Sequence, residues 1–102
     1  MQCLQCQREI GGEGGRSSVA AISGSISGDE SSDVYYRCVS CGAYTFLVVH
    51  EPFLGEEQES LRGPLTTAEG EAAVALINRC DTPWDKKCRC AAHREYFGDV
   101  LD

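Results

Sequence analysis

Three stretches of the chain carry the hydrophobic pattern of β-strands. Residues 20–26 and 34–38 alternate apolar with small or polar side chains, and residues 43–49 are dense in β-branched and aromatic side chains. Such side chains fit the pleated, half-buried surface of a sheet. The polar segment 28–33 is predicted as a loop between the first two strands, and Pro52 ends the third.

A helix pattern follows the strands. Thr66 precedes Glu69 by three residues, the spacing of a capping box, in which each side chain accepts a hydrogen bond from the other residue's backbone N–H. Small apolar residues then recur at helical spacing. The pattern predicts a helix over residues 67–79 that stops before Pro83.

Together these elements predict an α+β fold, with a small antiparallel β-sheet, one C-terminal helix and a Cys/His-rich loop. The sheet domain is expected over residues 1–53. Residues 54–102 begin with an acidic connector over 54–63, and their helix and loop pack on the sheet, with a short second helix or turn at 91–96. A chain of 102 residues has the size of one compact domain.

The chain is acidic, with nine Lys and Arg against sixteen Asp and Glu and a net charge of −7. This balance disfavours nucleic acid as a partner, because nucleic-acid-binding surfaces are basic. The longest apolar run, residues 72–77, is far below the ~20 residues that cross a bilayer, and the first residues show no secretory signal pattern. We therefore expect a cytoplasmic protein without membrane association.

Cysteine is the most informative residue type, with seven copies in the chain. An odd number in a reducing compartment disfavours a disulfide framework, so metal binding is the natural competitor. Four of the cysteines form two CxxC pairs: Cys3, Cys6, Cys38 and Cys41. A tight turn between paired cysteines aims both thiolates at one point, about 2.3 Å from a metal ion.

A four-thiolate metal site is therefore predicted at the two CxxC pairs. Gly42 suits the positive φ that such a cysteine knuckle needs. The alternatives are buried apolar thiols and a redox-active dithiol. The redox alternative is disfavoured because a reactive CxxC pair lies at the start of a helix, and neither pair here has a helix pattern behind it.

With these motifs, residues 1–50 resemble the zinc-ribbon family in its broad sense: a CxxC pair, a β-hairpin, a CxxCG pair and a further strand. The resemblance implies a structural zinc ion and a three-stranded sheet. It leaves the function open, since zinc ribbons serve in transcription, translation, enzymes and adaptors. Residues 38–44 also look like a rubredoxin knuckle, which would imply iron and electron transfer, but the short aromatic-rich chain between rubredoxin knuckles is absent here.

A second constellation has the spacing C-x7-C-x-C-x2-H and consists of Cys80, Cys88, Cys90 and His93. Three thiolates and one imidazole suit tetrahedral zinc, so a second zinc ion is predicted here. Two other interpretations stay open. Cys80 could be a core residue with surface thiols at 88 and 90, or a catalytic zinc could use three of these ligands and an open position.

Charge is unevenly distributed around this second constellation. Residues 79–94 carry +3, so the remaining chain carries −10. The favoured explanation is that basic side chains offset the negative charge of a thiolate-rich site. The alternative is a docking patch for an acidic partner, a phosphate or nucleic acid. The candidate patch comprises Trp84, Lys86, Lys87, Arg89 and Arg94, although packing over the metal site is the favoured role for the tryptophan.

The sequence contains no P-loop, no dinucleotide fingerprint and no carboxylate pair that could be placed in a site. A non-enzymatic role is therefore favoured. We expect a small zinc-binding protein with structural metal sites, acting as a protein-interaction adaptor or accessory subunit. The alternatives are a rubredoxin-like iron electron-transfer protein and a nucleic-acid-associated zinc ribbon.

Overall fold

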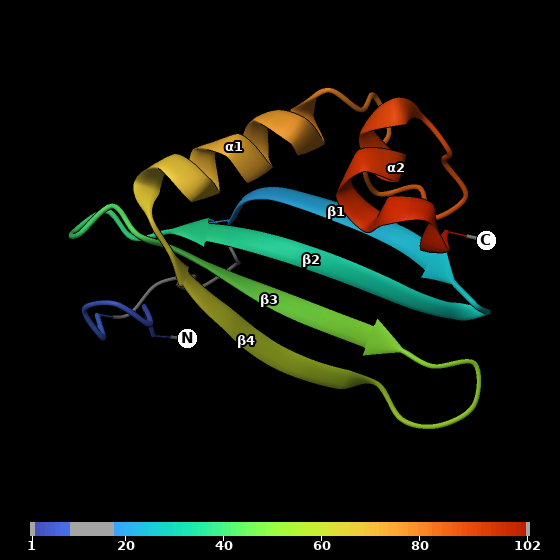
Figure 1. Ribbon diagram of the computed structural model, residues 1–102. Coiled ribbons are helices and arrows are strands. Elements are labelled where there is room, and N and C mark those ends of the chain that lie inside the picture. The colour runs from blue at the N-terminus through green and yellow to red at the C-terminus, as the bar shows by residue number, and fades with distance from the viewer. Residues whose placement is uncertain (1, 9–17, 102) are drawn as a thin grey trace.

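The computed structural model describes residues 2–8 and 18–101 of the chain. Its centre is one antiparallel sheet with the strand order β1-β2-β3-β4 (Figure 1). The strands span Ser18–Ile26 (β1), Asp29–Arg37 (β2), Tyr44–Glu51 (β3) and Gln58–Leu65 (β4). Two helices, α1 (Thr67–Asn78) and α2 (Ala91–Phe97), lie over one face of the sheet, and a short 3₁₀ turn, η2 (Gly98–Val100), follows. The predicted α+β class is confirmed.

The predicted polar loop over residues 28–33 is wrong. The chain turns at Ser27 and Gly28, whose φ angles are +52° and +84°, and β2 begins at the next residue. Two consecutive residues with positive φ form the tight turn whose twist matches a β-hairpin. The polar residues then pair with β1 on one side and β3 on the other, so backbone pairing overrides their low strand propensity.

The predicted connector over residues 54–63 is also wrong in its second half, because β4 begins at Gln58. Among the described residues this strand pairs with β3 only, and it is exposed over almost its whole length. An exposed edge strand buries little apolar surface and so lacks a hydrophobic pattern. The described part of the chain therefore forms a sheet of four strands, one more than the three that the zinc-ribbon resemblance implies.

The predicted helix is confirmed, together with its capping box. The Glu69 N–H donates to the Thr66 hydroxyl at 3.1 Å, and the Thr66 N–H donates to the Glu69 carboxylate at 3.0 Å. The helix ends at Asn78, and Arg79 is its C-cap. The second helix, predicted over residues 91–96, forms over Ala91–Phe97.

The hydrophobic core lies on both faces of the sheet. Between the sheet and the helices, Ile22, Tyr35 and Ile77 are buried together. On the other face, Tyr36 and Ala43 are buried with two of the CxxC cysteines. Among the described residues, no helix is both long and apolar enough to cross a membrane.

Helix α1 rests directly on the chain that follows the second CxxC pair. The Thr67 hydroxyl donates to the Gly42 carbonyl at 2.9 Å, and Gly70 faces the Tyr44 ring with no room for a side chain. At its other end, α1 leads into Cys80, two residues after the helix ends. The helix therefore connects the two predicted metal constellations, which Figure 1 places toward opposite ends of the sheet.

Candidate metal centres

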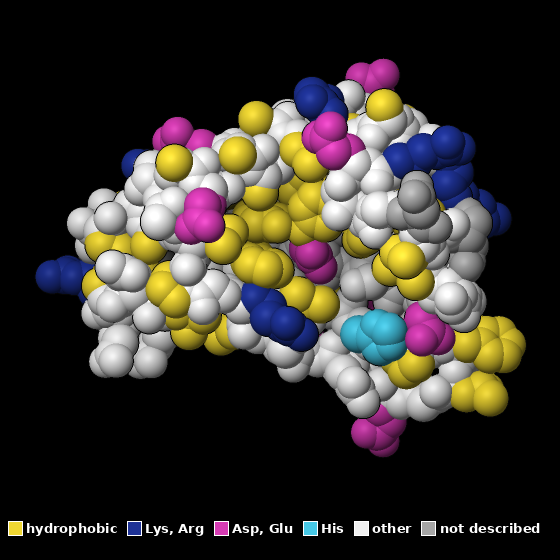
Figure 2. All heavy atoms as spheres, viewed as in Figure 1, with side chains coloured by type: hydrophobic (Ala, Val, Ile, Leu, Met, Phe, Trp, Pro, Cys, Tyr) yellow, Lys and Arg dark blue, Asp and Glu magenta, His cyan; other side chains and the backbone are white. Residues whose placement is uncertain are grey.

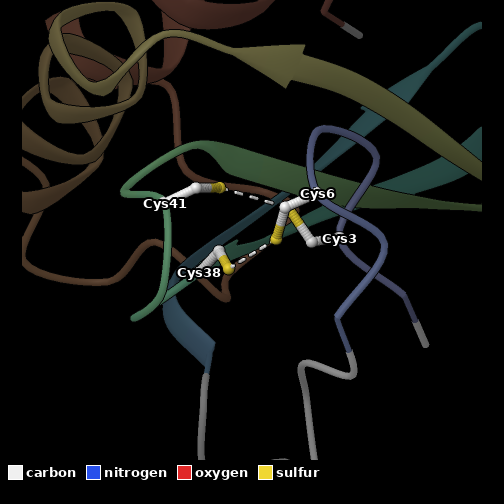
Figure 3. A group of neighbouring side chains, drawn as sticks. All are labelled: Cys3, Cys6, Cys38 and Cys41. Carbon is white, nitrogen blue, oxygen red and sulfur yellow. Dashed lines mark hydrogen bonds between the residues drawn. The ribbon is translucent and has the colours of Figure 1, made fainter.

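The four CxxC cysteines converge on one point between the N-terminal segment and the turn that joins β2 to β3 (Figure 3). Each pair sits in a tight turn closed by its own backbone. The Gln7 N–H donates to the Cys3 carbonyl at 2.9 Å, and the Gly42 N–H donates to the Cys38 carbonyl at 2.8 Å. Gly42 has a φ of +78°, which confirms the positive φ predicted at this residue of the knuckle.

The spacing of the four sulfur atoms fits a tetrahedral metal site and no disulfide. Cys3 Sγ lies 3.6 Å from Cys41 Sγ, and Cys6 Sγ lies 3.5 Å from Cys38 Sγ. A disulfide needs about 2.05 Å. Four sulfurs at about 2.3 Å from one ion stand about 3.8 Å apart, close to the observed distances. All four atoms lie within 4.8 Å of one another, so the group could hold a metal ion.

The thiols of this first site have strongly divided pKa values. The backbone N–H of Cys41, which acts against the effect of burial, lowers the pKa of Cys38 to about 6. The Ala43 N–H acts to lower the pKa of Cys41, but lost hydration and the neighbouring thiols together raise it to about 12. Four adjacent sulfurs repel one another's negative charge, so a cation is required before all four are thiolates.

The first site is anchored to the sheet by a residue that sequence reasoning missed. The Leu4 N–H donates to the hydroxyl of Thr45 at 3.3 Å, and Thr45 is fully buried on β3. This contact ties the first knuckle to the strand that follows the second one. A threonine in a β-branched strand carries no signal of such a role, because it looks like any other strand residue.

The second constellation also comes together, around the start of α2. Cys80 follows α1, and Cys90 is the N-cap of α2, where its sulfur accepts the His93 N–H at 3.4 Å. Cys80 Sγ lies 3.7 Å from Cys88 Sγ and 3.3 Å from His93 Nδ1. Cys90 Sγ lies 3.4 Å from the same nitrogen. In a tetrahedral zinc site with one imidazole, sulfur and nitrogen stand about 3.5 Å apart.

His93 is oriented for metal binding by a contact to β1. Its side chain is fully buried, and its Nε2 lies 3.0 Å from the Ser23 carbonyl oxygen. A carbonyl can only accept, so Nε2 carries the proton, and Nδ1, which faces the sulfurs, has its lone pair free. Metal-binding histidines are commonly fixed in this way through their other nitrogen. Sequence reasoning missed Ser23, because it contributes only its backbone carbonyl to the contact.

The Ser23 backbone fastens the C-terminal segment at two points. Its carbonyl accepts from His93, and its N–H donates to the Pro83 carbonyl at 2.8 Å. Both groups lie on the edge of β1 that does not face β2, where no strand pairs with them in the described chain. The second site is thus built against a sheet edge.

The thiols of the second site are divided in the same way as those of the first. The His93 N–H and ring lower the pKa of Cys90 to about 6. Burial, reinforced by the neighbouring sulfurs, raises the pKa of Cys80 to about 11. Cys90 can therefore bind a cation as a thiolate, whereas the buried Cys80 would lose its proton only when a cation binds.

The residues of the candidate patch lie on the loop before α2 and on α2 itself, and two of them make contacts within the chain. Lys86 forms an ion pair with Glu30 of β2, and Arg89 donates to the Lys86 and Cys88 carbonyls, both at 3.0 Å. Arg94 is exposed on α2 and Lys87 in the preceding loop. The predicted packing of Trp84 over the metal site is wrong, since its side chain is 68% exposed.

Searches against protein-family models, curated proteins and solved structures find no match to this chain. The structure therefore carries the functional argument by itself. It brings together the four predicted ligands of each site, and the two groups could hold metal ions.

Proposed function

We propose that the protein binds two structural zinc ions and acts as a protein-interaction adaptor or accessory subunit. The observation that carries the metal part is the convergence of four ligand atoms in each group, all within 4.8 Å of one another. Cys3, Cys6, Cys38 and Cys41 would hold the first ion, and Cys80, Cys88, Cys90 and His93 the second. Sites with four protein ligands are typical of structural rather than catalytic zinc.

Each ion would fasten a segment that lies outside the sheet to the sheet. The first would hold residues 2–8 against the turn between β2 and β3, and the second would hold the segment before α2 against β1. Zinc binding contributes folding free energy directly, and small domains with limited cores depend on such contributions.

Zinc fits the second site better than iron does. Three thiolates with one imidazole make a standard structural zinc set. The four-thiolate first site would accept either ion, so rubredoxin-like electron transfer through iron stays the alternative for that site. Visible absorption separates the two, because a ferric tetrathiolate centre is red and zinc is colourless.

The interaction part of the proposal is supported by the exposed Trp84. Tryptophan is enriched among the residues that dominate binding energy at protein interfaces. It lines a hollow of about 530 Å³ together with polar and charged residues of the same loop and Glu30. A protein partner would bury this side chain.

Metal analysis of protein purified without added metal tests the metal part. We expect two zinc equivalents in the native chain and one in the Cys88→Ser/Cys90→Ser variant. The matched control is Ser40→Ala, which changes a knuckle residue that is not a ligand and should keep both ions. A native chain that holds no zinc when folded, or that holds iron in the first site, would contradict the proposal.

Affinity capture tests the interaction part, with Trp84→Ala as the paired bait. Partners retained by the native chain and lost with the variant support the adaptor role. Partners retained equally by both would place the interaction elsewhere.

A further inference from the structure

The end of the sheet that carries α2 displays large hydrophobic side chains on two separate loops. Phe53 and Leu54, between β3 and β4, are 79% and 83% exposed, and Trp84 lies on the loop between Cys80 and Cys88. Figure 1 places both loops at this end, and in Figure 2 hydrophobic side chains protrude at the lower right. Exposed aromatic side chains of this kind are typical anchors of protein interfaces.

Both loops are tied to the first residues of β2. The Phe53 N–H donates to the Asp29 carboxylate at 2.8 Å, and Lys86 pairs with the carboxylate of Glu30. Because Asp29 and Glu30 are adjacent, the two loops flank one point of the sheet. Loops held in place lose less conformational entropy when they bind.

Segment 51–59 and the segment from Trp84 into α2 carry opposite charges. Residues 51–59 contain four glutamates and no basic residue, whereas residues 84–94 contain four basic residues and one aspartate. Figure 2 shows Lys and Arg side chains gathered above this end of the molecule. The first segment thus presents apolar side chains flanked by acids. The second presents a tryptophan beside a hollow that two lysines and two acidic residues line, and two arginines follow at positions 89 and 94.

We infer that two copies of the chain form a two-fold dimer, in which residues 51–59 of each copy dock beside Trp84 of the other. Complementary patches at the same end of a molecule can meet reciprocally across a two-fold axis, so both copies make both contacts. Opposite charges steer this encounter and fix its register. The inference rests on the interaction role proposed above and on neither metal ion.

Sedimentation of the zinc-loaded full chain over a wide concentration range is the first test. We expect a reversible dimer that weakens as salt is added, because its charged contacts are exposed. Trp84→Ala should raise the dimer dissociation constant at least about tenfold, as loss of an interface anchor does. The control Val39→Ala shortens an exposed apolar side chain in the turn between β2 and β3, at the other end of the sheet, and should leave that constant unchanged.

Charge reversal tests the reciprocal geometry. Lys87→Glu/Arg94→Glu should weaken self-association, and so should Glu56→Lys/Glu57→Lys. A mixture of the two variants should pair more tightly than either alone, because one copy keeps the acidic loop and the other keeps the basic patch. The control Glu71→Lys alters the charge of an exposed α1 residue and should change nothing.

A chain that stays monomeric at every concentration would overturn the inference. A dimer whose dissociation constant none of these substitutions changes would also overturn it. A monomer that binds a synthetic peptide of residues 51–59 would also overturn it and identify an acidic, aromatic segment of another protein as the occupant. Zinc content measured in the same samples separates this failure from failure of the metal proposal.

Discussion

Gly70→Ala should destabilise the protein, against the usual effect of this substitution in a helix. Alanine in a helix interior is more favourable than glycine by about 1 kcal/mol. Here a Cβ at residue 70 would stand 2.0 Å from Tyr44 Cδ1 and 2.1 Å from Tyr44 Cγ. Carbon atoms in contact normally lie about 3.5–4.0 Å apart.

Rotation of the tyrosine ring does not relieve this clash. The same Cβ would stand 2.7 Å from Tyr44 Cβ, which moves only with the backbone of β3. Helix α1 or the strand must therefore shift, and overpacking of this kind costs about 3 kcal/mol at the upper end of its usual range. Subtracting the gain in helix propensity leaves a net loss of about 2 kcal/mol.

Urea unfolding followed by far-ultraviolet circular dichroism measures this loss, with both proteins in the same concentrations of zinc and reductant. A loss of about 2 kcal/mol corresponds to a fall of roughly 8–16 °C in melting temperature. The control Ala72→Gly, at an exposed α1 position, should lose only about 1 kcal/mol. A Gly70→Ala protein as stable as the native chain would refute the close contact between α1 and β3.

Three further predictions concern the metal sites and the core. X-ray absorption of the zinc-loaded protein should show an average of 3.5 sulfurs and 0.5 nitrogen bound per zinc ion, because seven thiolates and one imidazole divide between two ions. A coordination shell dominated by oxygen would contradict both sites. Cys88→Ser/Cys90→Ser should speed hydrogen exchange at the Ser23 amide, which donates to Pro83, and spare the Gly42 amide of the first site. Burial raises the pKa of Asp33 although Tyr96 donates a hydrogen bond to it, so the folded state binds its proton more tightly. In urea unfolding, the free energy of unfolding of the native chain should therefore fall, relative to that of Asp33→Asn, as the pH rises from about 4 through the raised pKa of Asp33.

The elements with strong local signals could be predicted from the sequence. The capping box located the start of α1 within a residue, because its two side chains bond to the local backbone. The CxxC spacing predicted that the first four candidate ligands come together, since a knuckle is built within four residues. The second group of candidate ligands could also be predicted from the sequence, because three of its members lie within six residues.

The errors fall where distant pairing decides the structure. Polar residues 29–33 form a strand only because β1 and β3 pair with them from both sides. Gln58–Leu65 pairs with β3 at an exposed edge, where no burial pattern is required. The exposure of Trp84 depends on how its loop docks on β1 through Pro83, and nothing in the sequence near the tryptophan encodes that contact.

Helix α1 adjoins both candidate metal sites. Its first turn bonds to Gly42, next to a ligand of the first site, and its last turn leads through Arg79 into Cys80 of the second. Packed helices and sheets shift as rigid units, because close-packed interiors have few voids to absorb movement. A displacement of α1 that accommodates a larger residue at position 70 must therefore move Gly42, Cys80 or both. For this reason Gly70→Ala should also weaken zinc binding, although residue 70 touches no ligand.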